Sequence, residues 1–95
     1  IDIGVAYGSD TQLVKDCLLS AVKSNPYVLE FPAPSVRFES FGDSALDFRL
    51  YFYSRNYMVI EDIKSDIRLE IDKQFRDKNI SIPFPQTVIT VNKEL

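Results

Sequence analysis

Residues 35–53 contain the most regular alternation of apolar and polar side chains in this chain. From position 46 to position 53, Leu or Phe occupies every even position. Successive side chains of a strand point to opposite faces, so this run predicts a strand with one apolar face. Residues 35–39 alternate in the same way, and Gly42-Asp43-Ser44 is a turn signal between the two runs. Together the two runs predict an antiparallel hairpin.

The sequence alone leaves two registers open for this hairpin. In one register Glu39 faces Arg49 and Phe38 faces Leu50. In the neighbouring register Arg37 faces Arg49, and repulsion between like charges disfavours that pair. We therefore expect the register that places Glu39 opposite Arg49.

The spacing of apolar residues predicts one helix on each side of the hairpin. The apolar face of the first helix consists of Val14, Cys17, Leu18, Ala21 and Val22. Ser9 followed by Gln12 fits a capping box at its start, and Asn25-Pro26 ends it because proline cannot continue a helix. The apolar stripe of the second helix consists of Ile60, Ile63, Ile67, Ile71 and Phe75. Asn79 is expected just after the end of that helix.

Alternating residues near both termini predict two further strands. Ile1–Tyr7 forms one run, and Ile80–Ile82 begins another that Pro83-Phe84-Pro85 interrupts before Thr87–Val91 resumes it. Prolines beside a strand suit a sheet edge, where a missing N–H does no harm. The order β-α-β-β-α-β predicts an α+β, ferredoxin-like domain over residues 1–95, with a four-stranded antiparallel sheet and two helices on one face. Right-handed crossovers place the first and third strands in the middle.

The sheet face away from the helices is expected to carry most of the candidate binding residues. Its predicted members are Asp2, Gly4, Ala6, Arg37, Glu39, Asp47, Arg49, Tyr51 and Tyr53. Tyrosines exposed on a sheet can stack on RNA bases, but here the first strand adds no aromatic side chain and the face holds several acids. Tyrosines among mixed charges fit a protein–protein interface better, and a solvated face explains them equally well.

Composition excludes several classes of function. A chain of 95 residues, 45% hydrophobic and 26% charged, is one globular domain. Its net charge of −3, with Lys and Arg spread among acids, argues against binding to nucleic acid. The chain has no His, so it lacks the commonest zinc ligand and general base. Cys17, on an apolar helix face, is interpreted as a core residue, not a nucleophile. We therefore expect no enzymatic activity, metal or cofactor.

The chain also shows no membrane-spanning segment of its own. No apolar run approaches the roughly 18–20 residues that a spanning helix needs. The sequence opens at Ile1, without an initiator Met and inside a predicted strand. We therefore interpret it as a piece of a longer protein.

The turn Tyr7-Gly8-Ser9-Asp10 supports an alternative function. It leads into a helix N-terminus, whose free N–H groups can hold an anion. The chain could therefore be a stand-alone ferredoxin-like regulatory domain that binds a small ligand there. A glycine needed for backbone shape, followed by a capping serine, explains the same residues without a ligand.

Four short motifs occur in order along the chain. They are Gly4-Val5-Ala6-Tyr7-Gly8-Ser9-Asp10, Pro32-Ala33-Pro34-Ser35-Val36, Phe41-Gly42-Asp43-Ser44-Ala45-Leu46 and Ile82-Pro83-Phe84-Pro85-Gln86. With the predicted elements between them, they closely resemble the C-terminal α/β domain of the mechanosensitive channel of small conductance (MscS) family. The resemblance covers roughly Ile3 to Val91.

This resemblance implies a function that the residues alone do not show. The full protein would be a homoheptameric inner-membrane channel that opens under tension and releases ions and osmolytes after osmotic downshock. Its membrane helices would precede this region, and the α/β domain would form part of a hollow cytoplasmic cage. Candidates for facing the cage interior or a neighbouring subunit are Arg37, Glu39, Arg49, Tyr51, Tyr53, Pro83, Phe84, Pro85 and Gln86.

Overall fold

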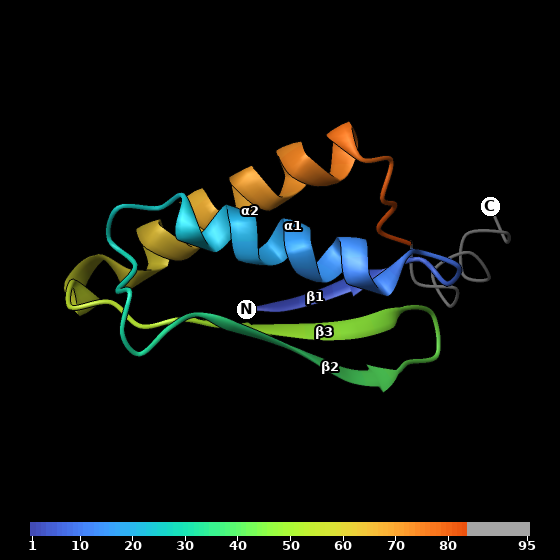
Figure 1. Ribbon diagram of the computed structural model, residues 1–95, viewed down its shortest axis with the longest axis horizontal. Coiled ribbons are helices and arrows are strands. Elements are labelled where there is room, and N and C mark those ends of the chain that lie inside the picture. The colour runs from blue at the N-terminus through green and yellow to red at the C-terminus, as the bar shows by residue number, and fades with distance from the viewer. Residues whose placement is uncertain (84–95) are drawn as a thin grey trace, which may run out of the picture.

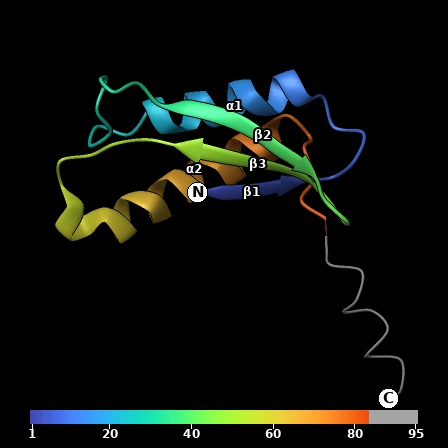
Figure 2. The same cartoon turned by 90° about the horizontal axis from the view of Figure 1, so that it is seen from below.

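Three strands and two long helices form the protein in the computed structural model, which describes residues 1–83 (Figure 1). In chain order the elements are β1 (Asp2–Val5), α1 (Thr11–Lys23), β2 (Ser35–Phe41), β3 (Leu46–Tyr51), the 3-10 turn η1 (Tyr57–Val59) and α2 (Ile60–Asp77). The strands form one antiparallel sheet in the order β1-β3-β2. Figures 1 and 2 show both helices on the same face of this sheet. The α+β class and the central position of β3 are thus confirmed.

The predicted first and fourth strands differ from the observed structure. β1 ends at Val5, two residues before the predicted end at Tyr7. The prediction of a strand over Ile80–Ile82 is wrong: this segment is irregular, although the Ser81 carbonyl accepts a hydrogen bond of 2.8 Å from the Ala6 N–H. The predicted strand Thr87–Val91 lies outside the described residues, so a fourth strand stays a prediction.

The register of the hairpin is the second correction. Arg37, not Glu39, lies opposite Arg49, and Phe38 lies opposite Phe48. The Phe38 and Phe48 rings stack with their centroids 5.0 Å apart, whereas the predicted register places Phe38 opposite Leu50. A bulge between Phe38 and Ser40 then leaves Glu39 without a partner across the ladder. Glu39 instead reaches both arginines, which relieves the repulsion on which the prediction relied.

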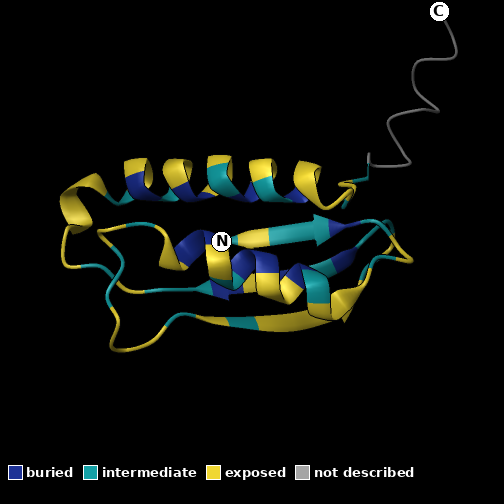
Figure 3. Cartoon of the chain, turned by 45° about the horizontal axis from the view of Figure 1, so that its top comes forward, coloured by how far each residue is buried: buried dark blue, intermediate teal, exposed yellow. Residues whose placement is uncertain are grey.

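The core lies between the sheet and the two helices, as the burial colours of Figure 3 show. Its buried side chains are Val5, Val14, Cys17, Leu18, Ala21, Val22, Leu46, Phe48, Leu50, Ile63, Ile67, Ile71 and Phe75. Every predicted apolar position of the first helix belongs to it, and four of the five predicted for the second, while Ile60 packs at its border. Cys17 is 3% exposed, which confirms its interpretation as a core residue, and burial raises the pKa of its thiol.

The capping residues of the two helices agree with the sequence prediction at the end of α2 but not at the start of α1. Asp10, not Ser9, caps α1: its carboxylate accepts from the N–H groups of Gln12 and Leu13. The predicted residue at the end of α2 is confirmed, since Asn79 adopts a left-handed φ of 59°. Its N–H donates to the Arg76 carbonyl, and the next N–H donates to the Phe75 carbonyl. These two bonds form a Schellman motif, which ends the helix firmly.

Two substitutions on α2 test the assigned packing. Ile67 is 1% exposed and Leu69, two residues later, is 67% exposed. We expect Ile67→Ala to lower the free energy of unfolding by about 2–5 kcal/mol, because it removes core contacts and leaves a cavity. Leu69→Ala should change it by about 0.5 kcal/mol or less. Urea unfolding measures both, and equal losses would contradict the assigned orientation of α2.

The thiol of Cys17 offers an independent test of the core. Because it is buried and its pKa is raised, we expect it to react with a maleimide only when the domain opens. Labelling in increasing urea should follow the unfolding curve measured by circular dichroism. Fast labelling in the absence of urea would show that α1 does not pack on the sheet as described.

Candidate functional site

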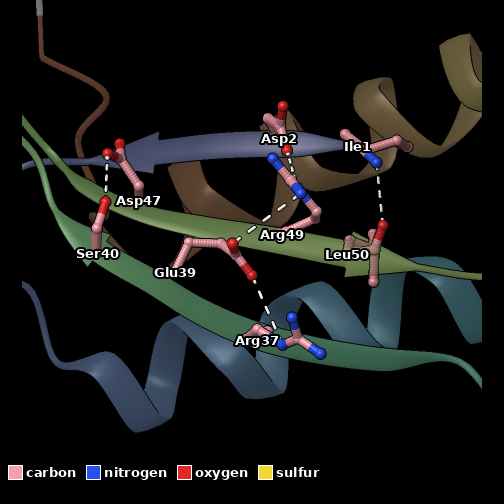
Figure 4. A network of polar contacts seen from close by, with 8 residues as sticks. All are labelled: Ile1, Asp2, Arg37, Glu39, Ser40, Asp47, Arg49 and Leu50. Carbon is pink, nitrogen blue, oxygen red and sulfur yellow. Dashed lines mark hydrogen bonds and ion pairs between the residues drawn. The ribbon is translucent and has the colours of Figure 1, made fainter.

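A strip of alternating charges crosses all three strands on the sheet face away from the helices (Figure 4). Arg49 of β3 donates from Nε to Asp2 Oδ1 of β1 at 2.6 Å. On its other side, Arg49 Nη1 lies 4.0 Å from Glu39 Oε1 of β2. Arg37 Nε closes the strip 3.6 Å from the other oxygen of Glu39. The strip therefore joins residues that are far apart in the sequence into one surface.

Electrostatics keeps this strip charged. The hydrogen bond from Arg49 holds the pKa of Asp2 below its ordinary value, and the same bond raises the pKa of Arg49 above its own. Both side chains are well exposed, so water screens their attraction and the pair adds little to stability. The pair instead fixes where the two side chains lie.

An aromatic ring extends the strip at one end. The Arg37 guanidinium lies 5.4 Å from the ring centroid of Tyr51, within the range of a cation–π contact. The structure therefore brings together four of the predicted candidates, namely Arg37, Glu39, Arg49 and Tyr51. It does not bring Tyr53 to them: Tyr53 lies beyond the end of β3, is 54% exposed, and accepts at its carbonyl from the Leu29 N–H.

The remaining candidates lie near or beyond the end of the described chain. Pro83 is half-buried and follows the segment that bonds to Ala6. Phe84, Pro85 and Gln86 lie outside the described residues, so their role stays a prediction.

Beside the strip the sheet surface is hollowed, with a volume of about 530 Å3. Gly4 lines this hollow, and a Cβ at this position would lie 3.1 Å from the Cβ of Ala45, so a larger residue would require Ala45 to shift. Asp47, another lining residue, accepts a hydrogen bond from the Ser40 hydroxyl at 3.2 Å. Within residues 1–83, no three His, Cys, Asp or Glu side chains come close enough together to hold a metal ion. Asp2, Glu39, Asp47 and Arg49 line the hollow, which makes it a charged surface.

The turn that could have held an anion is occupied by the chain itself. The Asp10 carboxylate accepts from the N–H groups of Gln12 and Leu13 at 3.0 and 3.2 Å. The Ser9 hydroxyl donates to the Ala6 carbonyl at 2.6 Å. A negative charge and filled donors at this helix start do not favour an anionic ligand. The regulatory-domain alternative therefore gains no support here.

The first and third sequence motifs meet at one end of the domain, and the residue just before the fourth reaches the same end. The Tyr7 hydroxyl of the first donates to the Gly42 carbonyl of the third, in the β2–β3 turn. The Ala6 N–H of the first donates to the Ser81 carbonyl, one residue before the fourth. Their order along the chain gave no sign of this contact, because the residues are separated by 35 positions or more. The first and third motifs therefore belong to one packed end of the domain.

None of the helices within residues 1–83 is both long and apolar enough to cross a membrane. Comparison with known proteins places the chain in a membrane-channel family nonetheless. Residues 1–82 match the family described as "Mechanosensitive ion channel MscS, C-terminal".

Individual relatives agree with this match. The chain is 38% identical to an MscS family protein of Haemophilus influenzae over 86 residues, which cover 90% of the chain and 8% of the relative. It is 36% identical to the mechanosensitive channel MscK of Escherichia coli over 94 residues, 99% of the chain and 8% of MscK. It is 34% identical to an MscS family protein of Synechocystis over 87 residues, 88% of the chain and 28% of that relative.

The chain thus spans less than a third of the length of each of these three relatives. The matched family and the shared sequence extend across nearly all of it. The chain therefore belongs to the MscS family of mechanosensitive channels, in which it corresponds to the C-terminal domain.

Proposed function

We propose that this domain forms part of the cytoplasmic cage of an inner-membrane mechanosensitive channel, which releases ions and osmolytes on osmotic downshock. The carrying observation is the match of residues 1–82 to the C-terminal domain of that family. The relatives are at least three times as long as the chain, which leaves room for membrane helices before it. In this proposal the full protein is a homoheptamer and the domain does no chemistry of its own.

The proposal also covers the architecture of the domain. A ferredoxin-like sheet has a fourth strand beside the first. Ile1 and Leu50 exchange both backbone hydrogen bonds, so alternation turns the N–H and C=O groups of Asp2 and Gly4 toward the outer edge of β1. This edge has the donors and acceptors that a fourth strand requires.

We further propose that the charged strip faces the water inside the cage and not a neighbouring subunit. The centres of protein interfaces are depleted of charged residues, because desolvating charges is costly. The strip holds four charged side chains that pair with one another, and Arg37 keeps 68% of its side chain exposed. Such a surface is stable in water without a partner and presents fixed charge to passing ions.

Charge reversal at Arg37 tests this orientation. In the full-length channel, Arg37→Glu should shift the reversal potential toward greater cation preference, because a negative charge replaces a positive one beside the ion path. Assembly should be unchanged. Lys73→Glu, an equal reversal on the exposed face of α2, is the control and should leave ion preference unchanged. Patch recording and size-exclusion chromatography measure the two properties, and loss of assembly in Arg37→Glu alone would place the strip at a subunit interface.

The channel function itself can be tested by survival. Cells without mechanosensitive channels should survive osmotic downshock when they express the full-length protein. Deletion of the segment matching residues 1–82 should abolish this rescue, provided that immunoblotting shows the truncated protein in the membrane. Full rescue without the segment would show that the channel does not need this domain. Failure of the intact protein to rescue cells or to conduct would contradict the proposed function.

A further inference from the structure

Large apolar side chains are exposed together at the end of the domain opposite the contact between Tyr7 and Gly42 (Figure 1). Tyr57 is 72% exposed, Met58 85%, Val59 44% and Tyr27 53%. They line one hollow of about 530 Å3 between η1, the start of α2 and the loop after α1. We call these four residues the Tyr57 patch. In Figure 3 the η1 turn forms the exposed, yellow end of the chain segment that leads into α2.

The local sequence of the patch is unusual for an exposed turn. The residue before a helix is commonly Ser, Thr, Asp or Asn, whose side chain accepts a hydrogen bond from the first turn. At α2 this position is Val59, which supplies no side-chain cap, and the preceding 3-10 turn has none either. Three apolar residues thus replace the polar ones that water would favour. Apolar residues are expected in this turn if another part of the protein covers it.

Charged residues surround the patch. Arg55, Asp62 and Asp66 line the same hollow. Asp62 and Asp66 are four residues apart on α2, so both lie on one side of the helix. The ion pairs found within residues 1–83 include neither of them. An apolar centre beside two available carboxylates is the arrangement of a protein docking surface, and it favours an occupant with an apolar side chain and a Lys or Arg.

The backbone shows which segment can reach this surface. Ile1 donates from its N-terminal amine to the Leu50 carbonyl at 3.0 Å and accepts from the Leu50 N–H at 2.8 Å (Figure 4). The ladder between β1 and β3 therefore continues to the first residue. A residue added before Ile1 would lie beside Tyr51, at the end of β3 from which the chain runs on to η1. Any preceding chain thus enters the domain from the end that carries the patch.

We infer that the Tyr57 patch is the docking surface for the segment that precedes Ile1 in the full-length protein. The lengths of the relatives support this occupant: the chain covers 8% of two relatives and 28% of a third, and it matches their family's C-terminal domain. In the proposed full-length protein, most of the remaining length precedes Ile1. The inference rests on the proposed function only in taking this domain as the end part of such a longer chain. A movement of the docked segment would displace η1, and through it α2.

Oxidation of Met58 tests the inference without any substitution. Met58 is the only methionine among the 95 residues. In the 95-residue chain, hydrogen peroxide should convert it rapidly to the sulfoxide. In the full-length protein the reaction should be about tenfold slower, because a covered side chain reacts only when its contact opens. Peptide mass spectrometry of both samples gives the two rates.

A matched control separates docking from general protection. Leu69 is 67% exposed on the outer side of α2, so Leu69→Met places a second methionine on the same helix away from the patch. It should oxidise at the same rate in both proteins. Equal rates for Met58 in the two proteins would overturn the inference.

Oxidation of Met58 in dissociated monomers identifies what covers the patch. Protection of Met58 that disappears when the full-length protein is dissociated into monomers would assign the patch to a second copy and overturn the proposed occupant. Protection that persists in monomers supports the preceding segment, even in a protein that neither conducts nor rescues cells from downshock. A failure of the proposed function is therefore distinguishable from a failure of this inference.

Discussion

The arrangement of the domain depends on the central strand β3. Its even-numbered residues Leu46, Phe48 and Leu50 are all at least 96% buried beneath the helices, and its backbone pairs with β1 on one side and β2 on the other. Since successive strand residues point to opposite faces, burying the even positions forces Asp47, Arg49 and Tyr51 onto the other face. The charged strip is thus a direct consequence of the hydrophobic packing that stabilises the fold.

The features predicted correctly from sequence are those set by burial. The apolar periods of the two helices and of β3 identified nearly the whole core, because excluding apolar side chains from water is the largest favourable contribution to folding. The left-handed residue Asn79 was also predictable, because few residue types tolerate that conformation.

The wrong predictions concern features that are determined by weak interactions or by contacts between residues far apart in the sequence. The register was predicted from one charge pair, but exposed pairs contribute little compared with the stacking of Phe38 on Phe48. A bulge also let Glu39 reach both arginines, which a simple pairing scheme cannot represent. Ser9 was predicted as the cap of α1, but Asp10 takes this position, because its carboxylate accepts from the N–H groups of the first turn. The contact between Tyr7 and Gly42 had no local signal at all, because only the completed sheet brings these residues together.

The two surfaces of the domain differ in what they can contribute to a larger assembly. The charged side chains of the strip already pair with one another. Burying them against a partner would therefore cost their hydration without adding new ion pairs. The Tyr57 patch is the reverse case: its tyrosines and methionine gain free energy, roughly 25 cal/mol for each Å2 removed from water, only when another surface covers them. The patch also lies on η1, directly before α2, whose isoleucines and Phe75 form one side of the core. A shift at the patch would therefore reach the sheet through packed side chains. In the proposed channel, the apolar end would therefore contact the rest of the protein, and the charged face would contact water and ions.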